Sequence, residues 1–289
     1  MNGKAVAIAH GAATIVNAIA LGKGAAFGVD LWTKAEVKLT NDPCVIVAEI
    51  ASDPKESTLL IEKTVSRVLQ KFSLEKSFGA KVKTHSNIPI AKGLKSSSAA
   101  ANATGLATTA ALGKTLDDIE IVKIGVEAAF DAKVTVTGAF DDACASFFGG
   151  IVITDNLKRQ IIKQSPLPED LTVLFHVPPQ KAYTADSKVD RLKTIKPLVE
   201  VAFEKALEGK VWEALTLNGL IYASASNLNT TIAIDALAAG AVAAGLCGKG
   251  PAVTAVVPND KIDSVKAALQ KYEGEILHAK MNWEKAKVL

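Results

Sequence analysis

The sequence predicts an α+β fold, and three features of its pattern favour this class. Short apolar runs such as residues 5–9 and 171–177 are typical of strands. Longer segments with apolar residues three and four positions apart, such as residues 58–72, are typical of amphipathic helices. The expected strands and helices do not alternate regularly along the chain, which disfavours a doubly wound parallel sheet.

Turn residues separate the expected elements, as Asn41, Asp42 and Pro43 separate two of the strands. The first half of the chain is expected to contain strands at 5–9, 35–39 and 45–50, a helix at 58–72, a strand at 81–85, helices at 99–112 and 116–130, and a strand at 151–154. The second half is expected to contain a strand at 171–177, helices at 199–207, 212–223 and 231–239, a strand at 252–257, a helix at 262–272 and a strand at 275–278.

The length of 289 residues suits one large or two medium domains. A polar stretch at residues 155–170, with two prolines, predicts the boundary between domains of residues 1–155 and 156–289. Hydrophobic residues make up 49% of the chain and charged residues 22%, which is the balance of a globular protein with a real core. Disorder is therefore not expected.

Charge and composition exclude several classes of protein. The net charge of +3 is small and its lysines and acids are interspersed, so no nucleic-acid partner is expected. The 3 cysteines lack C-x-x-C spacing and the 4 histidines are scattered, which disfavours a disulfide framework and a transition-metal site. No apolar segment suits a membrane span, so a cytoplasmic protein is expected, while the formation of a homo-oligomer stays open.

Residues 89–105, PIAKGLKSSSAAANATG, join a Gly-Leu-Lys turn to three serines and an alanine-rich helix expected from residue 99. Gly93 permits a tight turn, and the serines add hydroxyls to the N–H groups of the helix N-terminus. Such a terminus attracts anions through its unpaired donors and its partial positive charge. The stretch predicts a polyphosphate site with Lys95 as a mobile cation, and a simple serine N-cap is the alternative.

Two common nucleotide-binding motifs do not occur in this sequence. The segment GLCGKGPA at 245–252 has glycines and a lysine, but its spacing differs from G-x-x-x-x-G-K-[ST], and no G-x-G-x-x-G follows a strand. A P-loop kinase and a Rossmann dinucleotide site are therefore disfavoured. Three other segments accompany the serine loop: a small-residue run at 2–31, TGAFDDACASFFGG at 137–150, and a Gly-rich run at 243–257.

Taken together, these segments resemble the GHMP kinase superfamily, which includes galactokinase and the homoserine, mevalonate and phosphomevalonate kinases. Its central motif is P-x-x-x-G-L-G-S-S-A-A. Residues 89–94 match the start of this motif and residues 97–100 match its end. The sequence departs from the motif by one extra residue between these parts and by Lys95, which stands where glycine is usual. The variants GLKSSSAAANA and GAFDDACAS resemble the archaeal shikimate kinase branch. The resemblance covers essentially the whole chain. It implies a two-domain α+β fold, with an N-terminal domain like domain 2 of ribosomal protein S5 and a ferredoxin-like C-terminal domain.

The same resemblance implies an enzyme that uses ATP and Mg²⁺ to phosphorylate a hydroxyl of shikimate, giving shikimate 3-phosphate and ADP in chorismate and aromatic amino acid biosynthesis. Homoserine or mevalonate kinase activity is one alternative, and a non-catalytic metabolite sensor on this scaffold is another. ATP is expected to contact Gly93, Leu94, Lys95, Ser96, Ser97, Ser98, Ala99, Ala100, Gly248, Lys249 and Gly250.

Further roles follow from the resemblance. Asp142 is expected to orient or deprotonate the substrate hydroxyl, and Lys4 to lie near the transferred phosphate. Ser98 is expected to bind magnesium, together with a carboxylate eleven residues before the catalytic acid. That carboxylate is Asp131, or Glu127 one helical turn earlier.

The substrate pocket is expected to offer a cation and several hydrogen-bonding groups, because shikimate carries a carboxylate and three hydroxyls. Arg191 is the candidate for the carboxylate clamp, since bidentate binding favours arginine, although a solvated charge is an equal alternative. His10, Asn17 and Asp141 are the expected contacts to the substrate hydroxyls.

Overall fold

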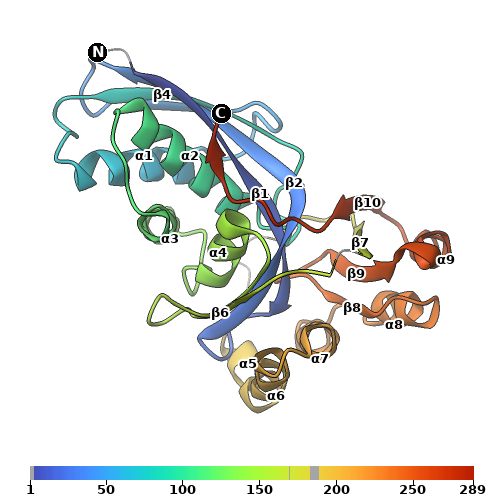
Figure 1. The fold of residues 1–289 in the computed structure, drawn as a ribbon. Coiled ribbons are helices and arrows are strands. Elements are labelled where there is room, and N and C mark those ends of the chain that lie inside the picture. Colours follow the sequence, from blue (N-terminus) through green and yellow to red (C-terminus); the bar gives the residue numbers. More distant parts are fainter. Residues whose placement is uncertain (1–2, 169, 183–188) are drawn as a thin grey trace.

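The computed structural model describes residues 3–168, 170–182 and 189–289, which form two β-sheets flanked by helices (Figure 1). In the larger sheet, of seven strands, β1 and β2 form a long antiparallel hairpin and β3 runs parallel to β4. The strands of this sheet are β1 (Lys4–Val16), β2 (Lys23–Thr40), β3 (Ile46–Ile50), β4 (Gly79–Ser86), β5 (Ile151–Asp155), β6 (Gln160–Ser165) and β11 (Lys287–Val288).

Four helices accompany the larger sheet: α1 (Leu59–Lys71), α2 (Ser96–Ala111), α3 (Asp118–Asp131) and α4 (Phe140–Phe148). Helix α2 packs on β1 and β2 and is flanked by α1, α3 and α4. Alanine, glycine, serine and threonine form most of α2, and alanines such as Ala7 and Ala9 cover β1 where the helix lies. Small side chains on both elements let the helix and the sheet approach closely.

The smaller sheet has four antiparallel strands in the order β10-β7-β9-β8. Alternate residues of β7 face two different apolar clusters: Phe175 packs with α6 and α7, and Leu174 packs with α8 and α9. The elements of this half are β7 (Leu171–Val177), α5 (Val189–Lys193), α6 (Lys196–Leu207), α7 (Val211–Ala225), α8 (Thr231–Ala238), β8 (Ala243–Leu246), β9 (Val253–Pro258), η2 (Asn259–Lys261), α9 (Ile262–Leu269) and β10 (Glu275–Lys280).

The β1–β2 hairpin belongs to both halves of the molecule. Its open end lies under α2, whereas Ile15 and Phe27 near the turn belong to the apolar cluster with α6 and α7. The Phe27 ring meets the Trp212 ring edge-on, with centroids 5.4 Å apart. Figure 1 shows the hairpin extending from the part of the larger sheet beside α2 down to α6 and α7. The hairpin therefore joins the two cores.

Residues near the end of the chain return to the larger sheet. Strand β11 pairs with β1, the Asn282 amide donates to the Gly28 carbonyl (3.0 Å), and the Leu289 amide donates to the Val6 carbonyl (2.8 Å). Strand β6 also belongs to this sheet, because it pairs with β5. Strands β6 and β11 both lie after residue 155 and still pair in the larger sheet, so the two sheets do not divide the chain at that residue.

The α+β class predicted from the sequence is confirmed, but several elements differ from expectation. Strands β1 and β2 are much longer than the segments 5–9 and 35–39, because small residues packed under a helix lack the β-branched signal of a strand. Strand β6 and helix α4 were not expected, and α2 begins at Ser96 rather than at residue 99. Among the described residues, no helix has the length and apolar character needed to cross a membrane.

We predict that Gly219→Ala destabilises the fold, although alanine favours helices over glycine by about 1 kcal/mol. A Cβ at this position of α7 would overlap the Gly245 backbone of β8 and lie 2.6 Å from the Leu246 nitrogen. We expect the free energy of unfolding to fall by about 1–3 kcal/mol, measured by denaturant titration.

The matched control is Gly105→Ala in α2, where the nearest atom to a new Cβ is Ile121 Cγ2 at 3.4 Å. This ordinary contact predicts a neutral or stabilising change. Equal effects of the two substitutions would contradict the close packing of α7 on β8.

Candidate active site

A cavity of about 510 Å³ lies where α2 and α4 begin, within the size range of small-molecule sites. Its wall combines the first turns of both helices with the end of β1, the segment 133–137 and the Gly-rich loop 248–250. The cavity wall contains four non-glycine residues with positive φ angles, of 49° to 65°: Ala91, Lys95, Lys133 and Ala139. Such conformations are costly for non-glycine residues and are typical of functional sites.

The first turn of α2 faces this cavity. Lys95 is the N-cap residue in the left-handed conformation (φ 65°), and no side chain caps the helix. The N–H groups of Ser96, Ser97 and Ser98 therefore belong to the first turn, where the helix itself supplies no acceptors. Ser96 and Ser97 line the cavity together with Ala100. The arrangement favours an anion site over the alternative of a serine N-cap.

The turn before α2 packs against the Gly-rich loop from the second half of the chain. Gly93 has a φ of 93°, and a Cβ there would overlap the Cys247 carbonyl oxygen. The Cys247 thiol donates to the Gly93 carbonyl (3.1 Å), and the Ala252 amide donates to the Lys92 carbonyl (3.2 Å). As a result, Gly248, Lys249 and Gly250 form one wall of the cavity with the turn.

A buried ion pair joins the two helix starts. Lys95 Nζ lies 3.0 Å from Asp142 Oδ2, and the two side chains are only 8% and 14% exposed. Burial lowers the pKa of Lys95, but Asp142, followed by Cys247 and Asp141, outweighs this effect and raises the pKa overall, so the ammonium stays charged. Asp142 Oδ1 and Thr14 Oγ1 are also buried in this cavity, without a hydrogen-bond partner among the described residues.

The neighbouring carboxylate, Asp141, has a different environment. It is 3% exposed, and its Oδ1 accepts a hydrogen bond from Asn156 Nδ2 (2.7 Å). Burial, followed by the charge of Asp142, raises the pKa of Asp141 to about 7, against the opposing effects of Asn156 and Lys95. Two adjacent acids with such different surroundings can take different roles in proton transfer.

The structure brings most of the expected site residues to the cavity. Gly93, Lys95, Ser96, Ser97, Ala100, Asp141, Asp142 and the loop 248–250 line it, as does Asn17 at the end of β1. Leu94 and Ala99 lie behind this wall in the apolar core. Ser98 lines a smaller cavity of about 40 Å³ beside it, to which Ser97 also contributes. Thr14 also lines the main cavity, although it belongs to no motif in the sequence that indicated a site.

Three expected residues lie elsewhere. Lys4 pairs with Glu36 (2.9 Å) at the far end of β1, roughly 33 Å from Thr14 along the strand at about 3.3 Å per residue, so it does not line the cavity. His10 does not line the cavity; it is buried, and its pKa is lowered by burial against the charge of Glu284. Arg191 is also outside the cavity lining and donates to Asn227 Oδ1 (3.0 Å) on the surface.

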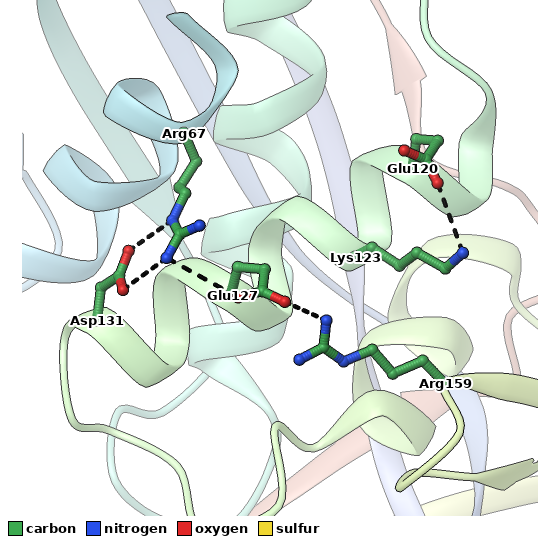
Figure 2. A network of polar contacts seen from close by, with 6 residues as sticks. All are labelled: Arg67, Glu120, Lys123, Glu127, Asp131 and Arg159. Carbon is green, nitrogen blue, oxygen red and sulfur yellow. Dashed lines mark hydrogen bonds and ion pairs between the residues drawn. The ribbon is translucent and has the colours of Figure 1, made fainter. Parts of the chain in front are cut away.

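The carboxylates expected to bind magnesium are held by arginines instead (Figure 2). Arg67 of α1 binds Asp131 through two hydrogen bonds of 2.6 and 2.7 Å, and Arg159 pairs with Glu127. Arg67 lowers the pKa of Asp131. Neither acid lines the cavity. Within residues 3–168, 170–182 and 189–289, no cluster of three His, Cys, Asp or Glu side chains is arranged for a metal.

We predict that Asp131→Asn leaves the affinity for Mg²⁺–ATP within twofold of the native value, because Asp131 contacts Arg67 rather than the cavity. The free energy of unfolding should fall by no more than about 1 kcal/mol, since both partners are about one-third exposed. Calorimetric titration of ATP with and without magnesium measures the first effect. A selective loss of magnesium-dependent binding would restore Asp131 as a ligand.

The comparisons with known proteins agree with this geometry. A family model described as the N-terminal domain of GHMP kinases matches residues 60–150. Among solved structures, homoserine kinase from Cytophaga hutchinsonii has a TM-score of 0.77 and 17% identity, covering 100% of this chain and 98% of its own. Mevalonate kinase from Methanococcus jannaschii has a TM-score of 0.75 and 18% identity, covering 96% and 98%. These structures share the fold.

Sequence similarity is much higher to curated archaeal proteins. The shikimate kinase of Methanosarcina mazei is 48% identical over 278 residues, which cover 96% of this chain and 94% of that protein. Such identity over nearly the full length confirms the family that the serine loop and the paired acids indicated. The chain belongs to the shikimate kinase family, within the GHMP kinases.

Proposed function

We propose that this protein transfers the γ-phosphoryl group of ATP to a hydroxyl of shikimate, giving shikimate 3-phosphate and ADP. The observation that carries this proposal is the buried Lys95–Asp142 pair, placed where the first turns of α2 and α4 meet in one cavity. Phosphoryl transfer needs phosphate positioning, charge neutralisation and an oriented alcohol, and this arrangement supplies groups for each.

The phosphates of ATP would lie over the first turn of α2. The N–H groups of Ser96 and Ser97 suit phosphate oxygens, and Gly248 lines the same cavity. Lys95 Nζ would lie 2.7 Å from a Cβ at Gly248, so the ammonium packs against this loop at the edge of the phosphate site. An apolar part of the wall that includes Ile50, Leu60 and Ile61 suits a nucleobase.

Magnesium would enter with the nucleotide and neutralise its phosphate charge. Mg²⁺ keeps several waters and phosphate oxygens and needs only one or two protein oxygens. The hydroxyls of Ser97 and Ser98, which line the main cavity and the smaller one beside it, fit that requirement.

The acceptor alcohol would lie between Asn17 and the paired acids. The unpartnered Asp142 Oδ1 can accept a hydrogen bond from the hydroxyl, while Asp142 Oδ2 holds Lys95 beside the phosphates. We infer that Asp142 orients the hydroxyl in this way. Lys133 and Lys249 also line the cavity, and they replace Arg191 as candidates for the substrate carboxylate.

A substrate panel tests the proposed function. The purified protein is incubated with ATP, magnesium and either shikimate, homoserine or mevalonate, and the phosphorylated product is identified by mass. Formation of shikimate 3-phosphate with equimolar ADP is expected. Turnover of homoserine or mevalonate instead would reassign the substrate, and binding of ATP and shikimate without turnover would indicate a sensor.

We predict that Asp142→Asn lowers kcat for shikimate by roughly 10²-fold or more, because Lys95 loses its counter-charge and the hydroxyl its acceptor. The Kd for ATP should change little. Asp118→Asn is the matched control, since Asp118 also lies in a first helical turn and pairs with a lysine, Lys285 (2.6 Å), away from the cavity. Equal activities of the two variants would remove Asp142 from the mechanism.

A further inference from the structure

Three buried threonines from neighbouring strands line the cavity, and their hydroxyls differ in one respect. They are Thr14 of β1, Thr33 of β2 and Thr84 of β4, and each is at most 2% exposed. Thr33 Oγ1 lies 2.8 Å from Ser86 Oγ, and Thr84 Oγ1 donates to the Glu49 carbonyl (3.4 Å). Thr14 Oγ1 is buried and has no hydrogen-bond partner among the described residues. Of the three, Thr14 is therefore the one whose hydroxyl the described part of the chain leaves for a ligand.

A buried hydroxyl without a partner is a cost to the folded protein. In water the group makes hydrogen bonds, and burial without a partner gives them up. Valine has the same branched shape as threonine and does not carry this cost. A polar side chain at Thr14 is thus explained if a ligand supplies the missing partner. Thr104 of α2 is also buried without a partner among the described residues, but it does not line the cavity.

The surroundings of Thr14 show which ligand group would reach it. A Cβ placed on Gly248 would lie 3.6 Å from Thr14 Oγ1 and 2.7 Å from Lys95 Nζ, so the hydroxyl and the ammonium approach the same point of the Gly-rich loop. Lys95 Nζ is in turn 3.0 Å from Asp142 Oδ2. Thr14 therefore lies beside the buried ion pair, where β1 meets the loop 248–250 and the start of α2.

The chemistry of the transfer decides between the two ligand groups that meet at this point. In the proposed function the reacting alcohol gives its hydrogen bond to Asp142 Oδ1. A second hydrogen bond, donated to the alcohol oxygen, would hold back the electron pair that must attack phosphorus. The oxygens of the γ-phosphoryl group are anionic and only accept hydrogen bonds, so a hydroxyl beside an ammonium suits them. These arguments favour the γ-phosphoryl group as the partner of Thr14.

We propose that the Thr14 hydroxyl donates a hydrogen bond to an oxygen of the γ-phosphoryl group of ATP, which makes Thr14 a catalytic residue. In the transfer the alcohol oxygen forms a bond to the γ-phosphorus. The bond from that phosphorus to the bridging oxygen breaks, and its electron pair leaves on ADP. The alcohol proton passes to Asp142 and from there to solvent, while Thr14 keeps its own proton. The inference rests on the proposed function.

The first test compares the binding of ATP and ADP to the native protein and to Thr14→Val. Calorimetric titration with magnesium and without shikimate measures both dissociation constants. Because only ATP carries the γ-phosphoryl group, Thr14→Val should weaken ATP binding by about three- to tenfold and leave the Kd for ADP within twofold. Thr14→Ser keeps the hydroxyl and should restore the native ratio of the two constants. If Thr14→Val fails to fold, Thr14→Ala, which also lacks the hydroxyl, replaces it.

The second test is the steady-state rate with shikimate, measured from the mass of the product. We expect kcat to fall by about 10- to 100-fold in Thr14→Val, because the transferred group loses a donor that holds it in line with the alcohol. The KM for shikimate should change little. The free energy of unfolding without ligand should stay equal or rise, since the variant removes an unpartnered hydroxyl. A purely structural role would instead lower stability together with activity.

Two other threonines provide matched controls. Thr84 lies in the same cavity wall, but its hydroxyl already has a partner, so any effect of Thr84→Val on nucleotide affinity should be equal for ATP and ADP. Thr104→Val removes an unpartnered hydroxyl outside the cavity lining, so kcat and the ratio of the two Kd values should stay native.

Three results would overturn the inference. An unchanged ratio of the Kd values for ATP and ADP in Thr14→Val would show that the hydroxyl does not contact the γ-phosphoryl group. A raised KM for shikimate with that ratio unchanged would place Thr14 at the acceptor alcohol. An unchanged kcat would remove Thr14 from the transfer. Absence of shikimate turnover by the native protein would instead refute the proposed function, and the binding ratio would still report on Thr14, so the two failures are distinguishable.

Discussion

The site depends on one close backbone contact, between the turn at Gly93 and the loop that begins at Cys247. These segments come from opposite halves of the chain, and no side chain fits between them at Gly93. Because they touch directly, the start of α2 and the loop 248–250 share one wall. The Lys95 ammonium lies between Gly248 and Asp142. A wider separation would admit water and weaken every charge interaction in the cavity.

Burying a lysine and an aspartate together is expensive unless each compensates the other. Here the cost is offset by their mutual attraction, and the positive φ of Lys95 adds strain. Ala139 before α4 is strained in the same way. The fold therefore holds both helix starts in fixed positions before any ligand arrives. A site built in this way loses little free energy to reorganisation when charge develops during a reaction.

Local motifs could be predicted from the sequence, whereas contacts between distant segments could not. The serine loop and the adjacent acids, Asp141 and Asp142, were identified because their neighbours in the sequence carry the pattern. The spacing that pointed to Asp131 carried no information about Arg67, which lies 64 residues away and binds it. Asn156 sits in an ordinary polar turn, so nothing in the sequence singled it out. The sequence underestimated the length of the β1–β2 hairpin because alanine and glycine have low strand propensity. Packing against a helix favours these small residues in the strands, and that packing is not visible in the sequence.

The return of β11 to β1 has a consequence for synthesis on the ribosome. Strand β1 is made before the smaller sheet and its helices, and β11, which covers its edge, is made after them. Until then the edge of β1 presents unpaired backbone groups, which invite pairing with other nascent chains. Completion of the larger sheet thus follows translation of the smaller sheet and its helices, and chains made only as far as that sheet are the species most in need of a chaperone.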